Sequence, residues 1–264
     1  MIGIILLSLL GVGLISAVIS DDDDDTAPAT ADRASGTEDP ETFETGGGDD
    51  TVFAGAGNDL VHAGADDDRV FGQDGFDIVI GGSGDDFMRG GAEDDILWAD
   101  SGEDTLFGDT GDDILFGADI FDSAAIFDEV AETGFLPISL DTFIDLSNES
   151  GEADTINGGV GDDDIVAGSN DIVSTGSGAD VVDIGDWVIP DEPAVITDFD
   201  PAEDIIIYNY TGTTAPNVFF SEDDSGDATV SIAVSSQENA VLATLSGTDI
   251  FDLGPNNLFI VQLT

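Results

Sequence analysis

The chain contains no lysine and no cysteine, and its 264 residues include only three arginines and one histidine. Without cysteine there can be no disulfide framework and no thiolate metal site. A nucleic-acid or polyphosphate partner is excluded because binding phosphate depends on Lys and Arg. The 59 acidic residues leave a net charge of −56, so a folded chain would repel itself strongly unless cations were part of its structure.

The single histidine, His62, also limits the catalytic chemistry that is available. One histidine cannot build a zinc triad, and no HExxH motif is present. No nucleophile motif such as GxSxG lies near it. We therefore predict no catalytic residues, no organic cofactor and no enzymatic activity. The alternative is a secreted hydrolase with an unrecognised site in residues 186–264.

Aspartate recurs at a fixed interval in two blocks of the sequence. Between Gly46 and Gly117 the interval is nine residues throughout, and after a break the pattern resumes with intervals of nine, eight and nine. Apolar residues make up 41% of the chain, which is enough for a core and argues against a disordered acidic tract. The aspartates are Asp50, Asp59, Asp68, Asp77, Asp86, Asp95, Asp104, Asp113, Asp154, Asp163, Asp171 and Asp180.

Each aspartate lies within a longer pattern. An aliphatic residue or Met follows every one of them by two positions, and a glycine precedes most of them by two positions. The glycines are Gly48, Gly57, Gly75, Gly84, Gly102, Gly111, Gly161 and Gly178. The pattern is GGxGxDxUx, where U is apolar, and it predicts a turn followed by a short strand with one buried side chain.

This pattern predicts calcium sites. Two successive repeats make one coil of a parallel β-roll, so alternate repeats belong to different sheets and alternate aspartates stack roughly 4.8 Å apart. Such rows of like charge need cations between them. Calcium takes six to eight oxygen ligands from carboxylates and backbone carbonyls, whereas magnesium demands a tighter octahedral geometry. We predict several bound Ca²⁺ ions, with the aspartates and glycines above as the metal-site residues.

Three repeats depart from the pattern. Asp66 and Glu93 replace the glycine two positions before the aspartate, so either the carboxylate joins the site or the turn is strained. The eight-residue interval before Asp171 makes that site uncertain as well.

The repeats resemble those of RTX proteins, the hemolysin-type calcium-binding nonapeptide family, of the alphaproteobacterial type. The stretch from Ile196 to Asp200, continued by Asp204 to Ile206, resembles the segment that closes the roll in serralysin-like proteins, although no peptidase domain is present. The resemblance implies a calcium-filled parallel β-roll that folds outside a bacterial cell, where calcium is abundant. We therefore expect an extracellular or cell-surface location in the bacterial outer envelope.

The fold expected is all-β: a two-sheet parallel β-roll with a short helical or irregular insertion and a small antiparallel β domain. Residues 1–20 are an apolar signal or anchor, and residues 21–45 are a disordered acidic spacer. Residues 46–117 and 151–185 are the two roll blocks, separated by an insertion at 118–150. Residues 186–264, with alternating and β-branched runs, form the C-terminal β cap.

The apolar run at residues 2–19 lies at the border between a signal-peptide core and a membrane anchor. RTX proteins exported by the type I route lack such a segment, so the export route stays open. A structural or interaction role follows for the exported chain, with a surface protein or a polysaccharide as the partner.

The two outer faces of the roll differ in composition. In the second, fourth, sixth and eighth repeats of the first block, the residues one and three positions after the aspartate point outward. Seven of these eight residues are apolar, which predicts a covered surface. We expect the 118–150 segment to pack there through Phe121, Ile126, Phe127, Phe135 and Leu136. The C-terminal β domain or an external partner are the alternatives.

Overall fold

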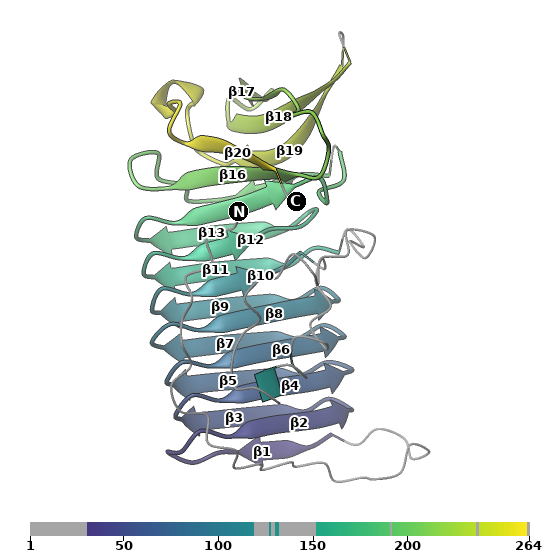
Figure 1. Cartoon of the computed structure of the whole chain (residues 1–264), viewed down its shortest axis with the longest axis vertical. Coiled ribbons are helices and arrows are strands. Elements are labelled where there is room, and N and C mark those ends of the chain that lie inside the picture. Colours follow the sequence, from purple (N-terminus) through teal and green to yellow (C-terminus); the bar gives the residue numbers. More distant parts are fainter. Residues whose placement is uncertain are drawn as a thin grey trace.

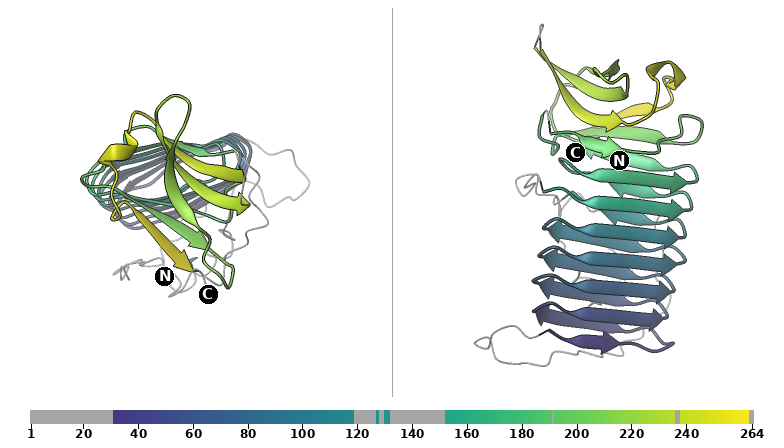
Figure 2. Two further views of the ribbon diagram at one scale, coloured as in Figure 1. Left: turned by 90° about the horizontal axis from the view of Figure 1, so that it is seen from above. Right: turned by 180° about the vertical axis from the view of Figure 1, so that it is seen from behind.

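A computed structural model of the protein describes residues 31–118, 127, 130, 131, 152–190, 192–235 and 238–262, without the side chains of 233–239. These residues form an elongated stack of coils in which the chain passes back and forth between two sheets (Figure 1). Viewed along the stack, each coil is flattened, with the two sheets facing one another (Figure 2). The predicted parallel β-roll is therefore confirmed.

Within the described residues, one sheet has eleven strands and the other has nine. We call them the odd sheet and the even sheet, after most of their strand numbers. In spatial order the odd sheet contains β1 (Arg33–Ser35), β3 (Thr51–Ala56), β5 (Arg69–Asp74), β7 (Phe87–Ala92), β9 (Thr105–Thr110), β11 (Thr155–Val160), β13 (Ile172–Ser177), β15 (Ala194–Ile196), β19 (Glu238–Leu245), β18 (Ala228–Ser235) and β17 (Val218–Glu222). The even sheet contains β2 (Thr42–Gly47), β4 (Leu60–Ala65), β6 (Ile78–Ser83), β8 (Ile96–Ser101), β10 (Ile114–Phe116), β12 (Asp164–Val166), β14 (Val181–Gly185), β16 (Ile205–Tyr210) and β20 (Leu258–Gln262).

The core of the roll lies between the two sheets. The side chain two residues after each repeat aspartate points inward, and all twelve of these side chains are at most 1% exposed. Because side chains alternate along a strand, the residues on either side of each buried one point outward. The twelve core residues are Val52, Val61, Val70, Val79, Met88, Leu97, Leu106, Leu115, Ile156, Ile165, Val173 and Val182.

The roll begins before the first expected repeat. Strands β1 and β2 pair in parallel with β3 and β4, and they bury Ala34 and Phe43 at the same inward position. The expectation of a disordered spacer up to residue 45 is therefore wrong for these strands. These two residues supply the inward apolar side chain that a further coil requires.

The C-terminal part extends the roll rather than standing apart from it. Strands β15 and β16 add to the two sheets in parallel, and β19 and β20 follow them in the same direction. The antiparallel part consists of β17, β18 and β19, followed by a 3-10 turn, η2 (Ile250–Asp252). The two sheets of the roll therefore supply the edges on which the cap is built.

The outer face of the even sheet is buried, as its composition predicts. Ile78, Ile96 and Trp98 are at most 3% exposed, and the Trp98 ring stacks on Phe116 with a centroid separation of 4.7 Å. Phe127 lies 5.1 Å from the His62 ring, between ring centroids, and is itself buried. Packing of the insertion on this face is thus confirmed for Phe127.

The other contact residues expected for the insertion, Phe121, Ile126, Phe135 and Leu136, lie outside the described residues, as does the apolar segment at 2–19. In the part of the chain that the structure describes, we find no helix long and apolar enough to cross a bilayer.

Replacing Ile96 by Asp tests how much the fold depends on this covered face. We expect Ile96→Asp to lower the free energy of unfolding by about 3–5 kcal/mol, because a carboxylate would be buried without a partner. Thr105→Asp is the matched control, since Thr105 occupies the equivalent position on the half-exposed face of the odd sheet. Urea denaturation in saturating calcium measures both; equal stabilities would contradict internal packing.

A second prediction concerns a buried carboxyl group on the even sheet. Asp183 on β14 is 3% exposed and accepts a hydrogen bond from Asn209 Nδ2 at 2.6 Å. Burial raises its pKa to about 7; the hydrogen bond from Asn209 opposes this shift, and the charge of Asp164 on β12 adds to it. Because the folded-state pKa is raised, the stability that Asp183 contributes is complete below its ordinary pKa of 3.8 and is lost as pH rises through 7.

The variant Asp183→Asn should therefore match the wild-type protein in stability at low pH and exceed it at pH 8. The shift from 3.8 to about 7 sets an upper limit on the order of 4 kcal/mol for the gain. The measurement is the difference in unfolding free energy between the two proteins from pH 5 to 8 in saturating calcium, so that the other carboxylates cancel. A difference that does not change with pH would contradict the prediction.

Candidate calcium sites in the aspartate rows

The turns between strands are held in left-handed backbone conformations. All eight glycines predicted as site residues have positive φ angles, from 107° at Gly48 to 150° at Gly161. Glycine adopts this region without a steric penalty, which explains its place two residues before the aspartate. The turn delivers each aspartate to the edge of the roll in the same orientation.

The twelve predicted aspartates form two rows, one along each edge of the roll, and every one is at most 3% exposed. Within a row, each aspartate accepts a hydrogen bond through Oδ1 from the backbone N–H of the acidic residue one coil earlier, which is Glu41 for Asp59 and an aspartate elsewhere. The N–O distances include 2.7 Å from Asp50 to Asp68 and 2.8 Å from Asp77 to Asp95. These bonds fix the side chain and satisfy one of its two oxygens.

The second carboxylate oxygen is different. In ten of the aspartates, Oδ2 is buried and has no hydrogen-bond partner. Leaving so many charged oxygens without partners inside a protein is strongly unfavourable, and each such group needs an explanation such as an ion. The ten are Asp50, Asp59, Asp68, Asp77, Asp86, Asp95, Asp104, Asp113, Asp163 and Asp180.

Main-chain carbonyl oxygens converge on the same places as the Oδ2 atoms. The space beside Gly72, where another residue would carry its Cβ atom, is bounded by Asp77 Oδ2 and the carbonyl oxygen of Gly90. These oxygens lie 2.3 and 2.6 Å from the position that such a Cβ atom would take. The space beside Gly108 is bounded in the same way by Asp113 Oδ2 and the carbonyl oxygen of Gly158. In the described residues no three acidic or histidine side chains come together as a metal cluster. A cation here would need carbonyl ligands besides the carboxylates, and such a mixed oxygen set is one that calcium accepts.

The ionised form of the aspartates in these rows is unfavourable without a cation. Burial raises the pKa of Asp77 and Asp104 to about 8 and that of Asp95 to about 9, with the neighbouring aspartates of the row contributing repulsion. Hydrogen bonds from the backbone lower these values but do not compensate. At neutral pH the fold would therefore hold protons on these groups unless a cation replaced them.

Asp171, which follows the eight-residue interval, is arranged differently from the ten. Its Oδ1 accepts from the backbone N–H of Asp154 at 3.0 Å, while its Oδ2 accepts from that of Gly168 at 2.6 Å. The shortened repeat brings the backbone close enough to satisfy both oxygens. Asp171 thus occupies the row without the unpartnered oxygen that marks the other positions.

Asp66 and Glu93, which replace glycine, keep the left-handed turn with φ angles of 73° and 79°. Both side chains are exposed, and Asp66 Oδ2 accepts a hydrogen bond from the backbone N–H of Gly48 at 3.1 Å. Of the two alternatives for these repeats, the structure shows the strained turn.

Three residues at the ends of the rows are not among the metal-site residues that the sequence predicts, although Asp204 belongs to the predicted roll-closing segment. Asp32 and Glu41 continue the nine-residue interval upstream of Asp50, each two residues before a buried apolar side chain, so the signal was present. The backbone N–H of each donates to the aspartate of the next coil, at 2.6 and 2.7 Å. At the other end, Asp204 accepts from the N–H of Asp180 at 3.1 Å.

The end residues Glu41 and Asp204 have protein partners for the second carboxylate oxygen, which has none in the ten interior aspartates. Glu41 accepts hydrogen bonds from Thr37 through both carboxylate oxygens, at 2.8 and 2.6 Å. Asp204 Oδ2 accepts from the backbone N–H of Asp200 at 2.7 Å. Asp198, in the predicted roll-closing segment, accepts from the N–H of Thr175 at 2.7 Å. The row that contains Asp59 is thus closed at both ends by side chains, Glu41 and Asp204, that need no ion.

The fold and the two rows define the chain as a β-roll of the calcium-binding class. Its sequence matches the RTX calcium-binding nonapeptide repeat, which is described as four copies, over residues 35–70, 44–79, 64–97, 80–115 and 150–182. The two blocks of the roll are therefore RTX repeats, and the protein is a Ca²⁺-binding β-roll protein. A comparison with curated protein sequences gives no significant match.

Solved structures with similarity to this chain include one from Azotobacter vinelandii and one from Serratia marcescens. The AlgE6R3 subunit of the Azotobacter vinelandii mannuronan C5-epimerase is 19% identical with a TM-score of 0.31, over 66% of this chain and 77% of that one. The extracellular lipase LipA from Serratia marcescens is 14% identical with a TM-score of 0.27 over 82% of this chain, which spans 40% of the lipase.

Replacing Glu93 by glycine tests whether its carboxylate acts in a site. We expect Glu93→Gly to raise the free energy of unfolding by about 1 kcal/mol, because it removes a left-handed non-glycine residue. Glu103→Gly is the control, since the φ angle of Glu103 is not positive and glycine there should be destabilising. Both are measured by urea denaturation with a parallel calcium titration. A loss of calcium affinity in Glu93→Gly would assign the carboxylate to a site.

Proposed function

We propose that this protein is an exported or surface-anchored calcium-binding protein, that calcium drives its folding, and that the folded roll has a structural or interaction role outside the cell. The observation that carries the proposal is the set of ten buried Oδ2 atoms without partners. In this proposal each of them, together with carbonyl oxygens of the adjacent turns, is a calcium ligand. The predicted glycines contribute through the backbone conformation that their turns require.

The cost of these unpartnered oxygens is large compared with the stability of a folded domain. Leaving one buried polar group without a partner costs about 1–3 kcal/mol, and more when the group is charged. Ten such costs exceed the roughly 5–15 kcal/mol by which native domains are stable. Ions that bind only the folded state would remove this cost and add their own binding free energy to folding. The chain would therefore be unfolded at neutral pH without calcium and folded with it.

An extracellular location fits the same chemistry. Free calcium is abundant outside cells and scarce inside, so a chain with these rows would fold after export and stay unfolded before it. In this proposal residues 1–20 direct export or anchor the chain, and residues 186–264 cap the roll. The chain would act by presenting the outer surface of the roll to a partner.

The test is far-UV circular dichroism of the chain in chelator, followed by titration with calcium and, separately, with magnesium. We expect a cooperative change from coil to β-structure at sub-millimolar to millimolar calcium and no comparable change with magnesium. A chain that is already folded in chelator and indifferent to calcium would overturn the proposal.

A pair of variants connects the transition to the aspartate rows. Asp77→Asn keeps the Oδ1 acceptor but replaces the unpartnered oxygen by an amide nitrogen, so it should raise the calcium midpoint and lower the number of bound ions. Glu103→Gln removes one exposed charge from a turn at the opposite edge of the roll and should leave both unchanged. Equal effects from the two would show that bulk charge, rather than the row, governs binding.

A further inference from the structure

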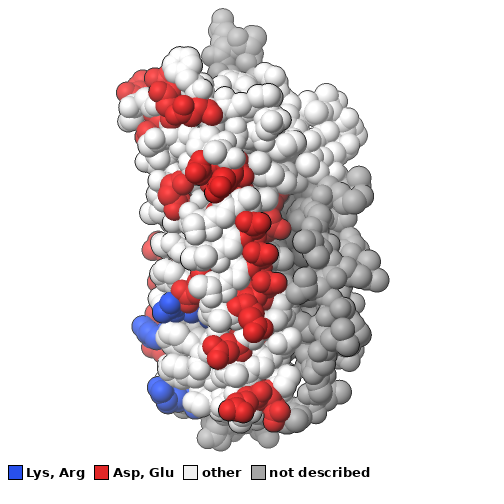
Figure 3. All heavy atoms as spheres, turned by 90° about the vertical axis from the view of Figure 1, so that its left-hand side faces the viewer, with Lys and Arg blue, Asp and Glu red and all other residues white. Residues whose placement is uncertain are grey.

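The basic residues of the chain are all on one outer face. Arg33, Arg69 and Arg89 are the only basic side chains apart from the histidine, and they lie on β1, β5 and β7 of the odd sheet. All three are exposed. In the space-filling view the basic side chains gather at one edge of the roll, while acidic side chains form a band along it (Figure 3). A chain with a net charge of −56 thus keeps its few cations together.

A row of aromatic rings accompanies these arginines. Phe53 stacks on Phe71 with centroids 4.9 Å apart, and the row continues to Phe87 and Phe107 at 5.8 and 5.6 Å. Arg33 lies 4.7 Å from the centroid of Phe53, and Arg89 lies 5.8 Å from that of Phe107. The rings are half-exposed, in contrast to the buried outer face of the even sheet.

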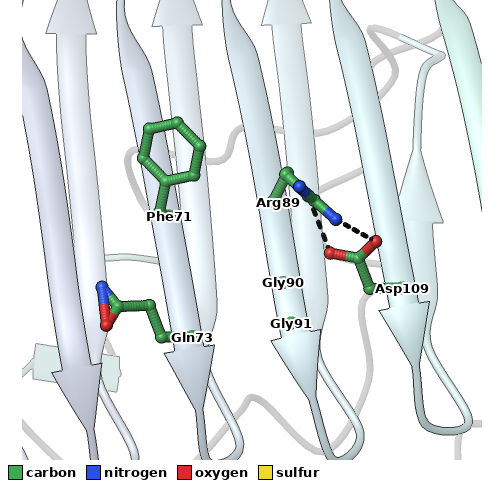
Figure 4. Close-up of a pocket in the computed structure, with 6 residues that line it drawn as sticks. All are labelled: Phe71, Gln73, Arg89, Gly90, Gly91 and Asp109. Carbon is green, nitrogen blue, oxygen red and sulfur yellow. Dashed lines mark hydrogen bonds and ion pairs between the residues drawn. The ribbon is translucent and has the colours of Figure 1, made fainter.

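A hollow of about 160 Å³ opens within this face. The backbone of Gly90 and Gly91 forms its floor, and Gln73 and Asp109 lie on the strands to either side. The Asp109 carboxylate points toward Arg89, and the Gln73 amide extends outward, away from the two glycines (Figure 4). Phe71 and Arg89 complete the lining. The guanidinium of Arg89 donates to both oxygens of Asp109, at 2.8 and 2.6 Å, which fixes two planar polar groups at the rim.

The walls of the hollow are built from strained residues. Gln73 and Asp109 have φ angles of 88° and 75° at a turn position where Gly55, Gly64, Gly82 and Gly91 stand in other repeats. The Gln73 amide makes no hydrogen bond within the described part of the chain and is exposed. The repeat itself would favour glycine at both positions, but Asp100 makes the same departure on the even sheet, so the exposed rings and polar groups around the hollow, rather than the strain, distinguish this face.

We propose that this face of the odd sheet, centred on the hollow, binds an uncharged polysaccharide. This names the partner class for the interaction role proposed above and rests on that proposal for the folded roll. A sugar ring has an apolar C–H face, which packs on exposed aromatic rings, and a rim of hydroxyl groups that both donate and accept. The Arg89–Asp109 pair and the Gln73 amide supply matching donors and acceptors. The row of rings runs beside the hollow and extends past it to Phe53 on β3, so a chain of sugars fits better than a single one.

The negative charge of the chain disfavours binding of anionic polymers. Nucleic acids and acidic polysaccharides would meet three cations within a chain that carries 59 acidic residues, and repulsion would oppose their approach. An uncharged polymer avoids this cost. The hollow is concave, largely apolar and edged by a few polar groups, which is the usual character of a site for a small ring.

The test uses the full chain in saturating calcium and three single variants. Gln73→Gly and Asp109→Gly remove the walls of the hollow while giving each turn the residue its φ angle favours, so the roll should remain folded. Asp100→Gly makes the same change at the equivalent position of β8 on the even sheet, where φ is 67°. The probes are hydroxyethyl cellulose, dextran and galactomannan, with alginate as the acidic comparison, in affinity gel electrophoresis.

We expect retardation by at least one of the uncharged polymers, a loss of affinity of tenfold or more in Gln73→Gly and Asp109→Gly, and no loss in Asp100→Gly. Binding to alginate alone, no binding to any uncharged polymer, or equal affinity in all variants would each overturn the proposal. Circular dichroism of the same samples separates the two proposals, because a roll that folds with calcium but binds no polymer refutes only this one. If the chain folds without calcium, the same assay is carried out in chelator.

Discussion

The structure depends on how buried carboxylates are accommodated at the edges of the roll. Each coil places an aspartate next to the aspartate of the coil before it. The backbone N–H of the earlier aspartate donates a hydrogen bond to one carboxylate oxygen of the later one. The second oxygen faces the turn carbonyls with no hydrogen-bonded partner at ten interior positions. A backbone N–H supplies that partner at three other positions: Thr37 for Glu41, Gly168 for Asp171 and Asp200 for Asp204. The ten interior positions are therefore chemically incomplete, whereas these three are complete without an ion.

Core packing and ion binding are consequently inseparable. A single coil offers one apolar side chain per strand, which is too little to bury alone, so coils gain stability only by stacking. Stacking also creates the rows of carboxylates. Each added coil thus brings a favourable apolar contact together with an electrostatic cost that a cation must offset. This coupling explains why the insertion after β10 is tolerated: β11 and β12 still pair with β9 and β10, and Asp154 accepts from the N–H of Asp104 as if the chain were continuous.

Much of the fold follows from the nine-residue interval, because a side-chain period of two and a turn of fixed length determine which sheet and which face each residue occupies. The twelve inward residues and the burial of the even face were predictable in this way. The interval also reached Asp32 and Glu41, but Glu41 is not an aspartate and the surrounding residues lack the glycines, so the first coil was not recognised. The division of roles between Oδ1 and Oδ2 was not predictable, because it depends on where the neighbouring coil places its N–H. The conformation of the turns at Asp66 and Glu93 was left undecided for the same reason, since either alternative satisfies the sequence.

The residues on the outer faces of the two sheets are not constrained by the repeat. The inward residue, the aspartate and the turn glycine are constrained by packing, charge and backbone conformation, whereas the outward positions meet none of these constraints. On the even sheet they are apolar and covered, with Phe127 against His62, and they serve the fold. On the odd sheet they carry all the arginines of the chain and a row of phenylalanines, and the next turn position holds Gln73 and Asp109 in place of glycine. Left-handed non-glycine residues alone do not distinguish this face, because Asp100 holds the equivalent position on the even sheet. What separates the odd face from the scaffold is that the rings and the arginines there remain exposed beside Gln73 and Asp109, whereas the even face is covered.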